Sequence, residues 1–200
     1  MNLLNVSRET AERLDLYSAL LQKWNPRINL VSRASLDSLR TRHFADSAQL
    51  YDLVDHPTDH WADLGSGGGF PGLVIAILAQ ETGSPARVTL VESDARKAAF
   101  LATVIRETGA RAEVLTGRIE AITPLGANVV SARALADLTT LLSYAARHLS
   151  AAGAALFPKG QTWQEELKAA QSAWHFDFRV VKSKTETGPV ILHLRGLSRA

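Results

Sequence analysis

One short segment constrains the fold of this chain more than any other: Ala62-Asp63-Leu64-Gly65-Ser66-Gly67-Gly68-Gly69-Phe70-Pro71-Gly72. It predicts a strand, a glycine-rich turn and the start of a helix. Glycines at 65, 67 and 69 permit positive φ and place no side chain between the backbone and a ligand. In open α/β sheets, a turn of this kind at the carboxyl end of a strand binds nucleotides. The segment therefore predicts a nucleotide-like cofactor.

Strand and helix patterns alternate after this turn. We expect strands at 60–64, 87–92, 112–116, 127–131 and 154–158, and helices from 71, at 95–107, at 135–148 and at 163–173. Two last strands, 176–183 and 190–194, flank Gly188-Pro189, which is typical of a hairpin turn. The order predicts an α/β, Rossmann-like fold with a mostly parallel seven-stranded sheet that ends in an antiparallel hairpin.

Residues 1–55 read as an N-terminal helical extension packed on a core formed by residues 56–200. A helix over 7–24 is capped by Ser7 and is expected to end at Trp24-Asn25-Pro26. An irregular connector at 27–32 and a second helix over 36–53 follow. The extension and the core are expected to form one compact unit.

Composition excludes several classes of protein. The chain has no cysteine, so disulfides, thiolate metal sites and a cysteine nucleophile are excluded. Residues 1–6 lack the pattern of a signal peptide, and no apolar run approaches the roughly 20 residues that span a bilayer. We expect a cytoplasmic enzyme. The formal net charge of +2 does not by itself indicate a nucleic-acid partner. A basic cluster over 27–43 is either a solvated face or a phosphate-binding patch.

Two cofactors fit the glycine segment. Gly67 to Gly72 matches the dinucleotide pattern Gly-x-Gly-x-x-Gly, with Glu92 about 20 residues further on, which would suit an NAD-linked reductase. S-adenosylmethionine has no phosphate, and the carboxylates of Asp63 and Glu92 could hold its ammonium group and its ribose hydroxyls. Acidic residues at two successive strand ends favour this class I methyltransferase interpretation. Asp94 is expected to cap the helix that follows.

Further segments accompany the glycine loop. They are Trp24-Asn25-Pro26-Arg27-Ile28-Asn29-Leu30, Arg42-His43-Phe44-Ala45-Asp46-Ser47, Glu92-Ser93-Asp94-Ala95-Arg96-Lys97 with Phe100-Leu101, Gly117-Arg118-Ile119-Glu120, Ser131-Ala132-Arg133-Ala134 and Lys159-Gly160. With them the chain resembles, over nearly its whole length, the RsmG (GidB) family of bacterial 16S ribosomal RNA guanine-N7 methyltransferases. It departs from the family at Gly68, where alanine is common, and at Val74, where proline is common.

The resemblance implies S-adenosylmethionine as the cofactor, and 16S ribosomal RNA or the 30S particle as the partner of a monomeric enzyme without metal or membrane. It places cofactor contacts on Gly65, Phe70, Ile119, Glu120 and Arg133. Their positions in the glycine loop and at strand ends add Asp63, Gly67, Gly69 and Glu92. The expected substrate-binding residues are Arg27, Asn29, His43, Arg118, Arg133 and Lys159.

The implied chemistry needs no catalytic residue. Guanine N7 carries a lone pair and no proton, so in-line displacement at the sulfonium methyl group needs positioning but no general base. Because the product is cationic, we expect Arg133 and Lys159 to grip a phosphate, a base oxygen or the cofactor carboxylate and not N7.

Other functions remain as alternatives. They are a methyltransferase acting on a small molecule or a protein, an NAD-linked reductase, and a binding module without activity. A hydrolase triad of His43, Asp46 and Ser47 is rejected because Ser47 lies in a helical stretch. Asp46 and Ser47 are expected to hold the N-terminal helices on the sheet or to shape the substrate entrance. A metal site at His43 is rejected because no ligand spacing recurs.

Overall fold

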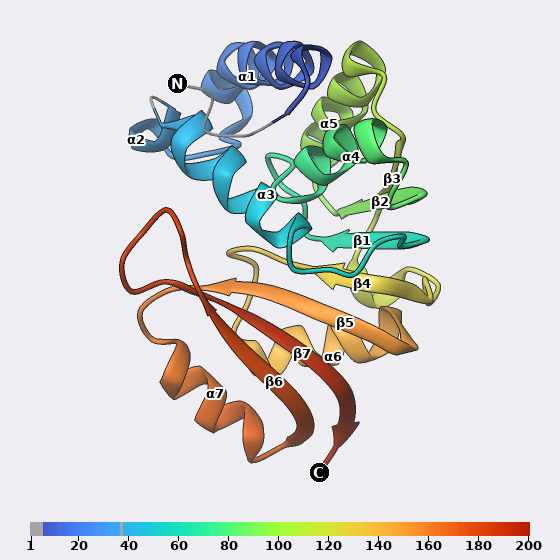
Figure 1. Ribbon diagram of the computed structural model, residues 1–200, viewed down its shortest axis with the longest axis vertical. Coiled ribbons are helices and arrows are strands. Elements are labelled where there is room, and N and C mark those ends of the chain that lie inside the picture. Colours follow the sequence, from blue (N-terminus) through green and yellow to red (C-terminus); the bar gives the residue numbers. More distant parts are fainter. Residues whose placement is uncertain (1–5, 37) are drawn as a thin grey trace.

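A single seven-stranded sheet organises the computed structural model, which describes residues 6–36 and 38–200 (Figure 1). Its order is β3-β2-β1-β4-β5-β7-β6. The strands are β1 (His60–Leu64), β2 (Arg87–Glu92), β3 (Ala112–Thr116), β4 (Ala127–Ser131), β5 (Leu149–Lys159), β6 (Trp174–Lys182) and β7 (Val190–Arg199). β1 to β5 run parallel, and β7 lies antiparallel to both β5 and β6. The predicted sheet, with its closing hairpin, is confirmed.

Helices cover both faces of the sheet. They are α1 (Arg8–Ile28), α2 (Arg33–Leu36), the π-helix η1 (Leu39–Phe44), α3 (Ala45–Tyr51), α4 (Gly72–Thr82), α5 (Ala95–Thr108), the short 3₁₀ helix η2 (Ile119–Ala121), α6 (Leu138–His148) and α7 (Trp163–Gln171). Successive strand residues point to opposite faces. Trp61 packs in the cluster with α1, α4 and α5, whereas Ala62 packs in the cluster with α6 and α7. α4 is apolar on every side because α1 and α3 cover the face that the sheet leaves.

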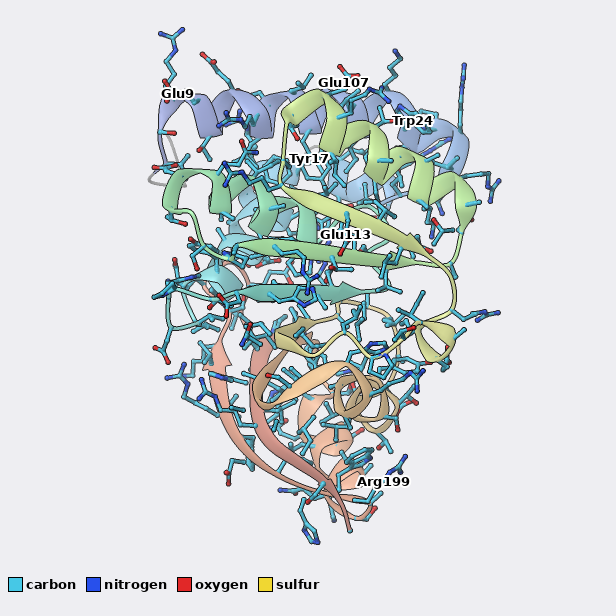
Figure 2. All side chains as sticks on the ribbon, turned by 90° about the vertical axis from the view of Figure 1, so that its right-hand side faces the viewer. Glu9, Tyr17, Trp24, Glu107, Glu113 and Arg199 are labelled. Carbon is cyan, nitrogen blue, oxygen red and sulfur yellow. The ribbon has the colours of Figure 1, made fainter. Side chains whose placement is uncertain are left out.

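The stripe of Leu14, Tyr17 and Leu21 on α1 is buried, as its helical spacing predicts. Figure 2 shows Tyr17 on the side of α1 that faces the body of the molecule. The expected end of this helix at Pro26 is wrong, because the helix continues to Ile28. Asn29 ends it in the left-handed conformation, with φ of 49°, and donates its N–H to the carbonyl of Asn25 at 3.0 Å.

The single helix expected over 36–53 is also wrong. The segment is divided among the end of α2, the π-helix η1 and α3, and position 37 lies outside the described residues. Ser35 Oγ donates to the carbonyl of Ser32 at 2.8 Å, a local bond that competes with a continuous helix. Residues five apart lie closer to one face in a π-helix than in an α-helix, so Leu39 and Phe44 are both buried.

Other boundaries differ by a few residues. α6 begins at Leu138 and not at residue 135, because Asp137 caps it by accepting from the N–H of Thr140 at 3.0 Å. β5 begins at Leu149 and β7 continues to Arg199, so both strands are longer than expected. None of the helices in residues 6–36 and 38–200 has both the length and the apolar character for crossing a membrane. The expected absence of a signal peptide concerns residues 1–6, and residues 1–5 lie outside the described part of the chain. The expected boundary between an N-terminal extension and a core at residue 55 stays a prediction.

Candidate functional site

A cavity of about 420 Å³ opens where the carboxyl ends of β1, β2 and β4 meet. We call it the first cavity. Most of the predicted cofactor residues line it, namely Gly65, Gly67, Phe70, Glu92, Ile119, Glu120 and Arg133. Its volume suits a small organic ligand. The fold thus brings together residues that are up to 114 positions apart in the sequence, from Leu30 to Tyr144.

The glycine turn is held against β2 by backbone and carboxylate hydrogen bonds. Gly65 and Gly67 have φ of 67° and 55°, a conformation that favours glycine. The N–H of Gly67 donates to Glu92 Oε2 at 2.8 Å, and the N–H of Asp94 donates to Glu92 Oε1 at 2.8 Å. Each carboxylate oxygen accepts one of these bonds and retains acceptor capacity for a ligand. Glu92 is therefore fixed in place at the wall of the cavity.

Asp63 and Gly69 lie behind the turn and do not line the first cavity. Asp63 is fully buried, and its carboxylate accepts from the N–H of Gly72 at 3.2 Å and from Ser131 Oγ at 2.7 Å. Burial raises the pKa of Asp63 to about 6, against these hydrogen bonds, which lower it. A Cβ at Gly69 would lie 2.4 Å from Leu73 Cδ1. The expected contact between Asp63 and the cofactor is therefore corrected: its carboxylate holds the start of α4.

The residues that come directly after β3 in the chain line another part of the first cavity. Ile119 is 8% exposed and presents an apolar wall, and its carbonyl lies 3.0 Å from the Nε2 of the buried His148. The exposed Glu120 accepts from the Tyr144 hydroxyl at 2.9 Å, and hydrogen bonds lower its pKa. Arg118 lines this cavity as well. It therefore lies beside the expected cofactor residues, and its expected contact with substrate stays a prediction.

A second cavity, of about 500 Å³, adjoins the first. The two share Leu30, Arg133 and Ala134 as lining residues. Of the expected substrate residues, the second cavity includes His43, Arg133 and Lys159. Arg27 and Asn29 line neither cavity, because Arg27 is exposed in the last turn of α1 and Asn29 forms its exposed end. Their expected contact with substrate is not supported by this position.

Arg133, Phe70 and His43 form a stack between the two cavities. The guanidinium carbon of Arg133 lies 4.9 Å from the centroid of the Phe70 ring, and the His43 ring stacks on the same ring at 4.9 Å. Phe70 is 4% exposed and packs on Tyr17 and Phe44. This arrangement places a cation, a flat apolar wall and an imidazole side by side.

Burial lowers the pKa of both ionisable groups in this stack, His43 and Arg133. Within the described residues, Arg133 makes no hydrogen bond or ion pair, and neither ring nitrogen of the buried His43 imidazole has a partner. Burial, with the charges of Arg133 and Arg42, lowers the pKa of His43 to about 4, so the ring is neutral at pH 7. Burial also lowers the pKa of Arg133, but a guanidinium stays charged in proteins.

Lys159 lines the second cavity, but its ammonium group is already paired with a carboxylate of the protein. Its side chain is 8% exposed, its Nζ lies 2.6 Å from Glu166 Oε2, and it donates to the carbonyl of Ala136 at 3.1 Å. The same Glu166 oxygen accepts from the N–H of Leu138, the first residue of α6. The ammonium group is thus paired within the protein and holds the start of α6, so the expectation that Lys159 grips RNA stays a prediction that its internal partners do not favour.

The loop between β6 and β7 closes the second cavity. This loop, residues 183–189, lies beside α2 and α3 in Figure 1. Its Lys184 N–H donates to Gln49 Oε1 at 2.6 Å, Glu186 Oε1 lies 2.6 Å from Arg42 Nε, and Thr185 donates to Asp46. Asp46 and Glu186 line the cavity. A place at the substrate entrance is one of the two roles expected for Asp46, whereas Glu186 is not among the residues expected from sequence. No local pattern could have shown a contact across more than 130 residues.

Asp46 joins α3 to the β6–β7 loop through its bond to Thr185, and it also lines the second cavity, so both roles expected for it stay predictions. Ser47 Oγ donates to the carbonyl of His43 at 2.7 Å, a bond within one helical turn. It makes no contact of the kind that a nucleophile makes with a base.

Comparisons with known proteins agree with this geometry. The family model described as rRNA small subunit methyltransferase G matches residues 10–194. A relative from Ruegeria pomeroyi, named ribosomal RNA small subunit methyltransferase G, is 52% identical over 198 residues, which cover 99% of this chain and 97% of the relative. A relative of the same name from Rhodospirillum centenum is 53% identical and is covered to 85%, with 94% of this chain.

Solved structures show likeness at the level of the fold. A SAM-dependent methyltransferase from Aquifex aeolicus has a TM-score of 0.61 at 12% identity, with coverage of 88% of this chain and 97% of that protein. TYW2 from M. jannaschii in complex with AdoMet has a TM-score of 0.54 at 15% identity, with coverage of 86% and 78%. At such identities the likeness extends to the arrangement of strands and helices alone.

Proposed function

Because the chain belongs to the rRNA small subunit methyltransferase G family, we propose that it transfers a methyl group from S-adenosylmethionine to N7 of a guanine in 16S ribosomal RNA. One observation carries the proposal furthest. A glycine-lined cavity for a nucleoside-like cofactor adjoins a second cavity, and Arg133 lies in the walls of both. Two adjoining cavities suit the transfer of a group from one bound molecule to another.

The residues of the first cavity fit S-adenosylmethionine. The Glu92 carboxylate, held by two N–H groups, would accept hydrogen bonds from the ribose hydroxyls. Ile119 would pack on the adenine, and Gly65 and Gly67 would let the amino-acid end approach the backbone. Arg133 could pair with the carboxylate of that end. When bound, S-adenosylmethionine supplies an electrophilic methyl group that the N7 lone pair takes by in-line displacement.

The task of the chain is to position the target base. Bringing two reactants into alignment supplies several kcal/mol of barrier lowering, about 7 kcal/mol or more where alignment is complete. Phe70 offers a flat wall at the border of the cavities, and Arg133 would hold the base or the cofactor carboxylate. His43 is neutral because its pKa is about 4, so it would not repel the cationic 7-methylguanine product. No general base is needed, because N7 carries no proton.

The target guanine must leave its helix to enter a walled cavity, so an unpaired or flipped nucleotide is the expected substrate. Exposed arginines beside the second cavity, at 33, 40 and 42, would meet the RNA phosphates. Arg40 and Arg42 form exposed ion pairs with Asp15 and Glu186, and such pairs are weak enough for phosphates to compete.

The test is transfer of a labelled methyl group from S-adenosylmethionine to 16S RNA and to 30S particles that lack the modification, with the product mapped by mass spectrometry. We expect 7-methylguanosine at one position of the small-subunit RNA. Cofactor binding without transfer to RNA would redirect the proposal to another methyl acceptor. Binding of NADH in place of S-adenosylmethionine would overturn it in favour of a reductase.

A further inference from the structure

Asp46 presents a carboxylate to the second cavity, which is also lined by Arg133, a cation to which the carboxylate is not bound in the described residues. It lies in the first turn of α3, and Arg133 lies just after β4. Each charge affects the pKa of the other, yet no ion pair within 4 Å joins them in the described residues. The Asp46 carboxylate and the Arg133 guanidinium thus line the same cavity without bonding to each other.

The Asp46 carboxylate has acceptor capacity to spare. Thr185 Oγ1 donates to Oδ1, and the part of the chain that the structure describes provides no partner for Oδ2. The Arg133 guanidinium has no partner there either, so its N–H donors are also free. Unpaired charged groups at a cavity wall are costly unless a ligand completes their hydrogen bonds.

Guanine offers the complementary edge. Its Watson–Crick edge carries the O6 acceptor beside two donors, N1–H and N2–H₂, and no other standard base has this order. A carboxylate accepts both donors in a bidentate pair, and a guanidinium donates to O6. Adenine would turn its N1 lone pair toward the carboxylate and has no N2 amino group. A cavity lined by both an anion and a cation that can meet this edge therefore discriminates against adenine.

We propose that Asp46 reads the N1–H and N2–H₂ donors of the target guanine while Arg133 donates to its O6, which makes Asp46 a specificity-determining residue. The inference rests on the proposed function and names how its substrate base is recognised. His43, which lines the same cavity and is backed by the Phe70 ring, then serves as the stacking wall. This arrangement leaves N7, on the far side of O6 from N1, clear of the carboxylate and free to face the first cavity.

The same contact contributes to the reaction. As the N7–C bond forms and the C–S bond breaks, positive charge develops on the base, and its N1–H becomes more acidic. A hydrogen bond from N1–H to a carboxylate therefore strengthens toward the transition state, which lowers the barrier. The step transfers no proton to Asp46.

The experiment combines a substrate that lacks one functional group, the guanine N2 amino group, with a protein variant that lacks the Asp46 carboxylate. Single-turnover methyl transfer is measured with 16S RNA that carries either guanosine or inosine at the methylated position; inosine keeps O6, N1–H and N7 but lacks the N2 amino group. For the wild-type protein we expect inosine to react about tenfold more slowly, the size of one hydrogen bond to a charged group. Asp46→Asn should slow the guanosine reaction by about tenfold or more and bring the guanosine-to-inosine ratio close to one.

Thr185→Val serves as the matched control. It removes the donor to Asp46 but keeps the carboxylate in the cavity, so the ratio should remain that of the wild type even if the rate falls. An unchanged ratio in Asp46→Asn would overturn the inference while leaving guanine-N7 methylation standing. Absence of N7 transfer by the wild-type protein would overturn the proposed function, and the inference with it. Circular dichroism on each variant separates these outcomes from a loss of folding.

Discussion

Asp63 and Lys159 both stand at strand ends, where sequence position suggests contact with a ligand. In the folded chain both side chains are enclosed and their polar atoms are bonded to the protein. Arg133, also at a strand end, has a guanidinium that lies at the border of both cavities and is bonded to none of the described residues. What separates these residues is the presence of an internal partner. A charge with a buried partner stabilises the scaffold, and a charge without one is available to a ligand.

The pKa of Asp63 predicts an effect of pH on stability. Its folded value of about 6 lies above the ordinary value of 3.8, so the folded state holds this proton more tightly than the unfolded state. The stability from Asp63 is therefore fully present below pH 4 and is lost as the pH rises through 6, by about 3 kcal/mol. Asp63→Asn cannot titrate, and it should lack this component.

The measurement is the free energy of unfolding of both proteins at pH 4.5 and pH 7 by chemical denaturation. About 2 kcal/mol of this component is lost between these two pH values. Only the difference between wild type and variant counts, because other carboxyl groups titrate equally in both. The same pH dependence in the two proteins would show that Asp63 is ionised in the fold at both pH values.

Lys159→Met should act on stability. It removes the ammonium group that neutralises Glu166, which is itself 24% exposed and can recover some hydration. We expect the free energy of unfolding to fall by about 2 kcal/mol, below the usual cost of breaking a fully buried pair. Lys168→Met on the exposed face of α7 is the control and should change stability little. Unaltered stability with weakened RNA binding would return Lys159 to the RNA-binding residues.

Among the elements, the glycine turn and α4 form a unit whose geometry depends on backbone conformation. Gly65 lies in the turn with φ of 67°, and a Cβ there would meet the tip of Leu135 at 2.6 Å. Gly109 ends α5 with nearly the same φ of 66°, and a Cβ there would meet nothing within 4 Å. The two positions share the backbone strain of a substitution, but only Gly65 borders the first cavity.

Gly65→Ala and Gly109→Ala should therefore separate strain from ligand contact. Each should lose about 1 kcal/mol of stability, because a side chain disfavours positive φ. Only Gly65→Ala should also bind S-adenosylmethionine about tenfold or more weakly, by isothermal titration calorimetry, since 1.4 kcal/mol of lost contact is a factor of ten. Equal affinities for the two variants would contradict the place given to Gly65.

Elements governed by local rules could be predicted from the sequence. The strands at 60–64, 87–92, 112–116 and 127–131 have the expected bounds, since short apolar runs between turn residues indicate buried strands. The segment over 36–53 could not be predicted, because its π-helix depends on burying Leu39 and Phe44 against other elements. The lining of the first cavity could also be predicted, because most of its residues come directly after strands that the sequence predicts. Much of the second depends on contacts such as Asp46 with Thr185, which only the tertiary fold creates.

On the scale of the whole molecule, the N-terminal helices and the β6–β7 loop meet across the second cavity. Arg42 with Glu186 and Lys184 with Asp52 pair across this junction, and the side chains of all but Glu186 are at least half exposed. Exposed pairs contribute at most about 1 kcal/mol each. The junction thus places basic groups at the entrance while acidic partners offset their charge, so the sign and strength of its field depend on a few residues.

Glu186→Gln should tighten RNA binding. It frees Arg42 for phosphate, so we expect a few-fold gain in affinity and a salt dependence steeper by about one counterion. Glu12→Gln, which frees Arg8 from an exposed pair on α1, is the charge-matched control away from both cavities. Filter binding over a range of salt concentrations measures both effects. Equal gains for the two variants would show that only net charge matters.

The sequence positions of the residues that line the two cavities imply an order in which these residues are synthesised. Every residue that lines the first cavity precedes Leu149, whereas the second also needs Lys159 and the stretch from Ser183 to Ile191. A ribosome makes the chain from its amino end, so the groups that would hold the methyl donor emerge before the wall that encloses the acceptor base. A growing chain thus has all the lining residues of the first cavity before those of the second, whose lining is complete only when the first part of the last strand has been made.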